Sequence, residues 1–243
     1  MYQPRSYRHR VRGQGLVSFN VVVKETDLYI SAASNLNNIA RSLVIDQRNI
    51  IEAYIKKHPS FATSLKPLPV ADDAPAIIKD MADAASKASV GPMAAVAGAI
   101  AEAVGKGLLA HSSEVIVENG GDIYLKSLKP RVVSIYAGIS PLSGKIGIDI
   151  SAADTPLSVC TSSGTVGHSL SLGKADAAIA ISRSAALADA AATAIGNLVK
   201  AAADIDRVLD FSTTIEGLLG ALIIIGDKIG IRGDLEICHL DAS

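Results

Sequence analysis

The sequence predicts an α+β protein in which antiparallel sheets are backed by helices. Segments of alternating apolar and polar residues come in pairs, joined by short turns such as Asn119–Asp122 and Gly226–Asp227. Longer segments with apolar residues at helical spacing lie between these pairs. The order is strands, helices, strands, and then strands, helix, strands. We therefore expect a single domain over residues 1–243, with two structurally similar halves as a further possibility.

The expected elements follow one another along the chain. A β-meander covers residues 5–32, with turns at 13–15 and 25–27. An amphipathic helix over 36–55 ends before Pro59, and a Pro-rich loop runs on to residue 75. The remaining elements are helices over 75–88 and 93–110, strands over 114–118, 123–126, 132–137, 145–150, 157–159 and 176–181, an Ala-rich helix over 182–199, and a hairpin over 221–240. Glu102 and Lys106 are one helical turn apart, which predicts an ion pair.

The composition argues against several classes of partner. Hydrophobic residues make up 49% of the 243, and 23 basic residues nearly cancel 24 acidic ones, so a broad basic surface for nucleic acid is not expected. Aromatic residues make up 4% and Trp is missing, which argues against a stacking platform for single strands. No apolar run approaches the roughly 20 residues of a membrane helix. Two cysteines make no disulfide framework. We expect a cytoplasmic protein that binds neither nucleic acid nor membrane.

The first segment that can carry chemistry is VIVENGGDIYL, residues 115–125, in which a strand runs into paired glycines, an acid and a second strand. Glycines permit positive φ and let a ligand approach the backbone closely. The simpler interpretation is a hairpin turn, because Asn-Gly is a common two-residue turn.

The second segment is CTSSGTVGHSLSLG, residues 160–173, which is rich in hydroxyls and glycines. Such a segment can offer N–H and O–H donors to a phosphate. Its ionisable side chains are Cys160 and His168. A solvated loop explains it as well, and it matches neither a Walker A loop nor a dinucleotide fingerprint.

The third segment is the Ala-rich helix SRSAALADAAATAIGNLV, residues 182–199. Asp189 and Thr193 are four residues apart and share a face, so both oxygens can reach one hard cation such as Mg²⁺. The alanines around them let another segment or a ligand come close. The alternative is that Asp189 caps a neighbouring loop and that Thr193 bonds back to a carbonyl.

Together these segments resemble the ApbE family of flavin transferases. ADAAAT, residues 188–193, is similar to the family's ADAxAT helix motif, and ENGGDI, residues 118–123, to its strand–turn signature ending in GGDI. TSSG, residues 161–164, followed by His168, is similar to its TSG…H segment, and residues 90–104 correspond loosely to its glycine-led helix. The likeness covers roughly residues 90–200 in the family's order. It is nearest to a shorter subgroup that is labelled thiamine-biosynthesis-like.

The resemblance implies T-fold-like halves, binding of FAD with Mg²⁺, and transfer of FMN to a Thr or Ser of an acceptor protein. Asp189 and Thr193 would be metal ligands, with a backbone carbonyl near Ala94. The residues that would border the flavin are Asn119, Gly120, Gly121 and Asp122. The residues that would lie near the phosphates are Ser163, Gly164 and His168. His168 and Asp189 are the candidate catalytic residues.

Departures from the family pattern keep other functions open. After His168 the family carries a segment like DPxTG, whereas this chain has SLSLGKAD, and Ala95 stands near an expected lysine. One alternative is therefore a non-catalytic binding or assembly factor on the same scaffold. Another is a sulfur-handling role of Cys160, because a thiol beside a donor-rich loop can have a lowered pKa. A buried structural cysteine is the simpler explanation for Cys160. The small-residue helices make a homodimer plausible.

Overall fold

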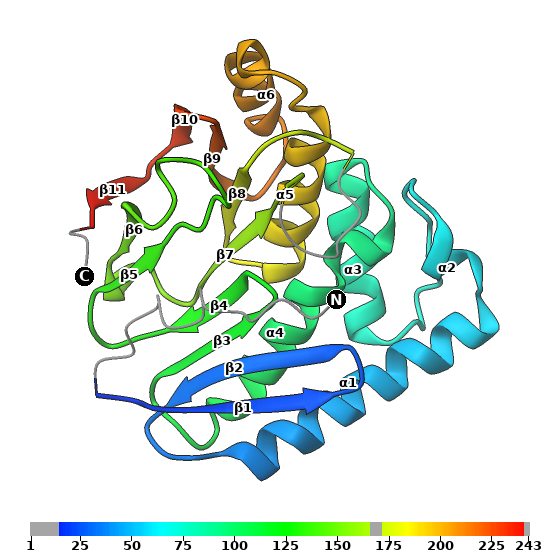
Figure 1. Ribbon diagram of the computed structural model, residues 1–243. Helices are drawn as coiled ribbons and strands as arrows, with labels where there is room; N and C mark the ends of the chain where they lie inside the picture. The colour runs from blue at the N-terminus through cyan, green and yellow to red at the C-terminus, as the bar shows by residue number, and fades with distance from the viewer. Residues whose placement is uncertain (1–14, 166–171, 241–243) are drawn as a thin grey trace.

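The computed structural model describes residues 15–165 and 172–240 (Figure 1). Eight antiparallel strands form one sheet in the order β1-β2-β3-β4-β7-β8-β9-β10. They are β1 (Val17–Val23), β2 (Thr26–Ala32), β3 (Val115–Asn119), β4 (Asp122–Lys126), β7 (Leu157–Ser162), β8 (Ala177–Ser182), β9 (Leu218–Ile225) and β10 (Lys228–Gly233). A second antiparallel sheet has the order β11-β6-β5. Its strands are β5 (Arg131–Ser134), β6 (Ile146–Ile150) and β11 (Glu236–His239).

Helices cover one face of the large sheet, and the small sheet covers part of the other (Figure 1). The α-helices are α1 (Asn37–Lys57), α2 (Ser60–Thr63), α3 (Ala76–Ala88), α4 (Val96–Leu108), α5 (Ala185–Leu198) and α6 (Ile205–Ser212). The 3₁₀ turns are η2 (Pro92–Ala95), η3 (Ala152–Asp154) and η4 (Ala202–Asp204). One apolar core lies between helices and sheet and is rich in alanine, and the other lies between the sheets and consists mostly of Ile, Leu and Val.

The large sheet has the same order of elements on either side of its central pair, β4 and β7. On one side, β1 and β2 are followed by helices α1 to α4 and then by β3 and β4. On the other side, β7 and β8 are followed by α5 and α6 and then by β9 and β10. Division into two T-fold-like halves is in keeping with this order and stays a prediction.

The predicted α+β class, with antiparallel sheet backed by helices, is confirmed. The turn at Gly120–Gly121 is present, and both glycines have positive φ, which a two-residue hairpin turn requires. The predicted ion pair forms, with Lys106 Nζ 2.7 Å from Glu102 Oε1.

Some expected boundaries are wrong. Strand β7 continues to Ser162, because Cys160 and Thr161 pair with β8, so these residues belong to a strand and not to a loop. The loop expected over 59–75 contains the short helix α2. The small-residue helices α4 and α5 are largely buried inside the molecule. They are therefore no evidence for a homodimer, which stays a prediction.

Within the described residues, no single helix is long and apolar enough to cross a membrane. The pair Ala76–Ala88 and Pro92–Leu108 reaches that length and apolarity only when its two members are taken together, and it is bent by 106°.

Candidate functional site

Helix α5 carries one polar line on an otherwise buried surface. Ten of its 14 residues are buried, and the other four are Asp189, Thr193, Asn197 and Leu198. The first three recur every four residues and therefore share one face of the helix. Ser184 caps the helix, since its hydroxyl accepts a bond from Leu187 N at 3.3 Å. The line of Asp189, Thr193 and Asn197 is the side of α5 on which polar groups can meet a ligand.

A single peptide group joins this line to the turn between β3 and β4. The carbonyl of Ala97 accepts a bond of 3.0 Å from Asn119 Nδ2, and the N–H of Gly98, in the same peptide, donates to Asp189 Oδ2 at 2.9 Å. Ala97 and Gly98 are in the first turn of α4, where backbone N–H groups lack partners inside the helix. Asp189 thus caps α4 from α5, which is the simpler of the two roles considered for it.

The two helices cap each other. Glu102 Oε2, on α4, accepts a bond of 2.7 Å from the N–H of Ala185, the first residue of α5. A carboxylate near a helix N-terminus is favourable because of the positive end of the helix dipole. The helices also cross closely, since a Cβ on Gly98 would lie 2.2 Å from Ala185 O. This double connection fixes Asp189 relative to α4.

Asp122 lies on the strand neighbouring Cys160 and is 7% exposed. Its Oδ1 accepts a bond of 3.2 Å from Thr161 N. Beside it, Glu118 Oε1 accepts a bond of 2.8 Å from Gly121 N and so ties down the glycine turn. The turn residues named from the sequence are therefore held between β7 and α4.

Burial makes ionisation of this group of carboxyls unfavourable. Removal from water and, to a smaller extent, the nearby charge of Glu118 raise the pKa of Asp122 to about 7, although bonds from the Thr161 N–H and the Cys160 thiol oppose this shift. Burial also raises the pKa of Asp189 well above its usual range, and the charge of Asp122 adds to this effect. Buried carboxyls with raised pKa values either retain a proton or attract a cation.

The expectation of a lowered pKa for Cys160 is wrong. Its side chain is completely buried, and burial followed by the charges of Asp122 and Asp189 raises the pKa of the thiol well above its usual value. The thiol lies 3.6 Å from Ala185 O, within bonding distance for sulfur. Because the thiolate is the reactive form, these surroundings favour a structural cysteine.

Ser163 and Gly164 lie at the opposite end of the polar line. Asn197 Oδ1 accepts a bond of 2.7 Å from Leu172 N, and a Cβ on Gly173 would lie 1.7 Å from Gly196 O. Gly164 lies next to Gly173, because a Cβ added to Gly164 would be 2.3 Å from the carbonyl oxygen of Gly173. From Asp189 to Asn197 the helix rises about 12 Å. His168 lies outside the described residues.

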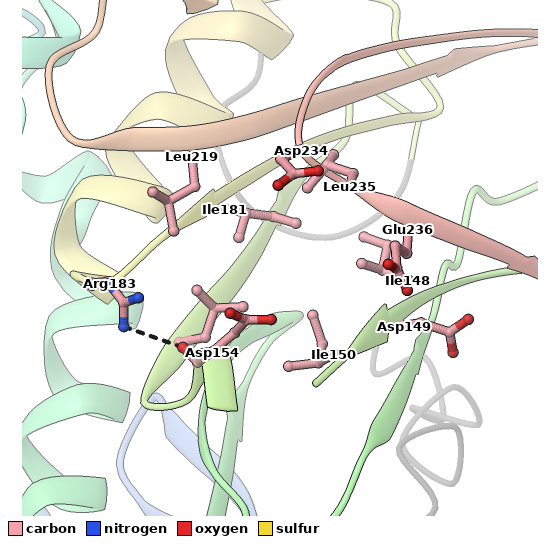
Figure 2. Close-up of a pocket in the computed structure, with 11 residues that line it drawn as sticks. Ile148, Asp149, Ile150, Asp154, Ile181, Arg183, Leu219, Asp234, Leu235 and Glu236 are labelled. Carbon is pink, nitrogen blue, oxygen red and sulfur yellow. Dashed lines mark hydrogen bonds between the residues drawn. The ribbon is translucent and has the colours of Figure 1, made fainter. Parts of the chain in front are cut away.

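A separate cavity of about 220 Å³ opens between the two sheets (Figure 2). Ile148, Leu157 and Ile181 belong to its lining and to the core between the sheets, and Arg183 Nη1 donates to the carbonyl of Asp154 at 3.2 Å. None of the described residues predicted for the site lines this cavity. It belongs to the face of the large sheet opposite α5, so the polar line and the cavity are different features.

The fold agrees with that of solved ApbE proteins. The match to the ApbE protein from Thermotoga maritima covers 90% of this chain and 97% of that protein, with a TM-score of 0.60 and 15% sequence identity. The match to the H257G mutant of the flavin transferase ApbE from Vibrio cholerae covers 89% of this chain and 96% of that protein, with a TM-score of 0.58 and 12% sequence identity. At these identities the likeness shows the fold alone, and the class of protein that it defines is the ApbE fold.

The chain belongs to the family described as AbpE bacteria, which matches residues 8–229. Similar proteins at higher identity carry the name UPF0280 protein. The one from Methanococcus aeolicus is 45% identical over 203 residues, 82% of each chain. The one from Methanocella arvoryzae is 43% identical over 214 residues, 88% of this chain and 87% of its own. The resemblance inferred from residues 90–200 is confirmed and extends over most of the chain.

The sequence missed residues whose role depends on contacts between distant segments. Glu102 stood out only as a partner of Lys106, and its bond to the start of α5 joins residues 83 positions apart. Cys160 stood out as a thiol, but its place between Asp122 and Ala185 comes from strand pairing and helix packing. A clue was present for Gly98, because a glycine inside a helical segment often marks a close approach.

Proposed function

We propose that this protein binds a flavin nucleotide with Mg²⁺ and transfers FMN from FAD to a Thr or Ser hydroxyl of an acceptor protein. The observation that carries the proposal is the peptide Ala97–Gly98, which joins Asn119 of the glycine turn to Asp189 of α5. Two motifs that lie about 70 residues apart in the sequence thus meet at one point. Family membership and the fold shared with flavin transferases support the same function.

The chemistry of the donor set fits a magnesium ion. Asp122 and Asp189 are oxygen donors with no cationic side chain among the causes that set their pKa values, and each ionises more easily with a cation beside it. Thr193 adds a hydroxyl one turn along α5. In the part of the chain that the structure describes, no three His, Cys, Asp or Glu side chains form a metal-binding group. Mg²⁺ commonly takes one or two carboxylates and completes its shell with water and substrate phosphates.

Different residues along α5 would contact the metal ion, the flavin and the phosphates. Asp189 and Thr193 would hold the ion with the carboxyl of Asp122 beside them, and the ion would stabilise the charge that develops on the phosphate oxygens. Asn119, Gly120, Gly121 and Asp122 would border the flavin end, and Ser163 with Gly164 would lie near phosphate at the other end. In the reaction, the acceptor oxygen forms a bond to the FMN phosphorus, AMP leaves, and the hydroxyl proton passes to a base. The rise of about 12 Å along the polar line suits an extended ligand.

Replacement of Asp189 tests this function. In an assay with FAD, MgCl₂ and a Thr-containing peptide, we expect Asp189→Ala to release AMP at least about a hundredfold more slowly than the wild type. Asp206→Ala is the matched control, because Asp206 is an exposed carboxylate on α6. The absorbance spectrum of the purified protein gives a second measurement, since a bound flavin is visible there. Equal AMP release by both variants would contradict the proposal.

One observation favours the non-catalytic alternative on the same scaffold. Ala95 stands near the position where the family resemblance predicts a lysine, and it is fully buried, so this position offers no cation to a ligand. If the protein is a non-catalytic binding or assembly factor, the wild type binds FAD or ADP with Mg²⁺ and releases no AMP at any MgCl₂ concentration. Calorimetry together with the AMP assay distinguishes this outcome from transfer.

A further inference from the structure

Glu102 and Asp189 occupy matching positions where α4 and α5 cross. Asp189 Oδ2 accepts a bond of 2.9 Å from the N–H of Gly98, and Glu102 Oε2 accepts a bond of 2.7 Å from the N–H of Ala185. Gly98 precedes Glu102 by four residues, and Ala185 precedes Asp189 by four, so each carboxylate lies about one turn beyond the N–H that the other one holds. The two bonds therefore close a ring that runs through both helices.

The close crossing of the helices leaves little room for this ring to shift. A Cβ on Gly98 would lie 2.2 Å from Ala185 O and 2.9 Å from Asp189 Cβ. Ala185 O is also 3.6 Å from Cys160 Sγ, on β7. The side chain of Glu102 is itself only 13% exposed. The first turn of α5 is thus packed against both α4 and the sheet.

Two side chains cap the start of α5, but only one of them belongs to another helix. Ser184 caps α5 locally, because its hydroxyl accepts a bond of 3.3 Å from Leu187 N. Glu102 holds the same end of α5 from α4. Loss of either bond leaves a backbone N–H without its partner, but only loss of the Glu102 bond opens the ring that contains Asp189.

We propose that Glu102 is a positioning residue for the metal ion. It acts through the N–H of Ala185 and fixes where the first turn of α5 places Asp189 relative to α4. This inference rests on the proposed function, in which Asp189 binds Mg²⁺. Replacement of residues that orient metal ligands typically weakens metal binding about 10- to 100-fold. Glu102 acts on the ligand through the backbone, so we expect the lower end of this range.

The test uses Mn²⁺ as the probe, because electron paramagnetic resonance measures its free concentration during a titration of the full chain. We expect Glu102→Ala to weaken Mn²⁺ binding about tenfold. Glu102→Gln retains an oxygen acceptor for the N–H of Ala185 and should bind Mn²⁺ within about threefold of the wild type. In the AMP assay, Glu102→Ala should need about tenfold more Mn²⁺ for half-maximal rate, with kcat at saturating Mn²⁺ changed by less than about threefold.

Ser184→Ala is the matched control, because it removes a cap from the same end of α5 and leaves the ring closed. Both Ser184→Ala and Glu102→Ala should lower the urea midpoint of unfolding. The Mn²⁺ affinity of Ser184→Ala should nevertheless stay within about twofold of the wild type. Lys106→Ala removes the other partner of Glu102, which is 2.7 Å away, and should also leave Mn²⁺ affinity within about twofold.

Each alternative result has a definite meaning. Wild-type Mn²⁺ affinity in Glu102→Ala overturns this inference, and an equal loss in Ser184→Ala overturns it by assigning the effect to the stability of α5. Equal weakening in Glu102→Gln overturns it by assigning the effect to charge. If Glu102→Ala does not fold, Glu102→Asp, with a side chain one methylene shorter, takes its place. In all these cases the proposed function is judged separately by Asp189→Ala, whereas failure of the wild type to bind Mn²⁺ overturns both.

Discussion

Glu114, Asp122 and Asp189 are carboxyls largely removed from water, but their surroundings shift their pKa values in opposite directions. Glu114 accepts bonds from Ser127 Oγ at 2.7 Å, Leu128 N at 3.0 Å and Arg131 Nη2 at 3.0 Å. These bonds and the guanidinium charge lower the pKa of Glu114 to about 2, in spite of the opposing effect of burial. No cationic side chain contributes to the pKa of Asp122 or Asp189, and both are raised.

The difference separates a structural cluster from a candidate site. Glu114, directly before β3, and Arg131, the first residue of β5, form an ion pair that connects the two strands without any ligand. Asp122 and Asp189 lower the stability of the folded protein when both are ionised, and a cation would relieve this cost. Perturbed carboxyls without a protein cation are typical of functional sites.

The largest expected effect is a loss of stability when the ion pair of Glu114 and Arg131 is removed. Glu114→Ala leaves the nearly buried guanidinium of Arg131 without this carboxylate, and the side chain of Arg131 is only 3% exposed. Loss of one member of a buried ion pair costs about 3–4 kcal/mol of unfolding free energy. Urea denaturation measures it, with exposed Glu236→Ala as the control. A loss below about 1 kcal/mol would mean that Arg131 is satisfied without Glu114.

The pH dependence of stability should have opposite signs in the two regions. The pKa of Glu114 is lowered, so its contribution is present above pH 4.5 and is lost as the pH falls toward 2. The pKa of Asp122 is raised from 3.8 to about 7, so the folded state binds the proton more tightly, and stability falls as the pH rises from about 4 to 7. In EDTA we expect about 1–2 kcal/mol more stability at pH 5 than at pH 8. A flat profile between these values would contradict the shift at Asp122.

Replacement of Asp122 by the neutral Asn tests whether the charge of this carboxylate destabilises the folded protein when no cation is bound. At pH 8 without divalent metal, we expect Asp122→Asn to be more stable than the wild type by about 1 kcal/mol, because it removes a buried charge and retains an acceptor for Thr161 N. Addition of MgCl₂ should raise the Tm of the wild type and have less effect on the variant, since a ligand stabilises the state that it binds. Exposed Asp154→Asn is the control. A lower Tm for Asp122→Asn in EDTA would show that its ionised form stabilises the fold.

Local patterns in the sequence predicted most elements of the fold and one side of the site. The turn at Gly120–Gly121 and the shared face of Asp189 and Thr193 follow from spacing, because hairpin turns and helical repeats are properties of neighbouring residues. The bond from Gly98 to Asp189 joins residues 91 positions apart, and no local pattern encodes it. The same holds for the electrostatics, since a pKa depends on what burial and distant segments place beside the group.

The smallest expected effect concerns the two thiols and tests the sulfur-handling alternative. Burial raises the pKa of both thiols, but Cys160 is fully buried, whereas Cys238 on β11 retains partial exposure. Because both access and thiolate formation limit alkylation, a maleimide reagent should label about one thiol per chain under native conditions, and mass spectrometry should place it on Cys238. In urea both should react. Rapid native labelling of Cys160, or a persulfide on it in the purified protein, would reopen a reactive role for a thiol that otherwise stabilises the fold between β7 and α5.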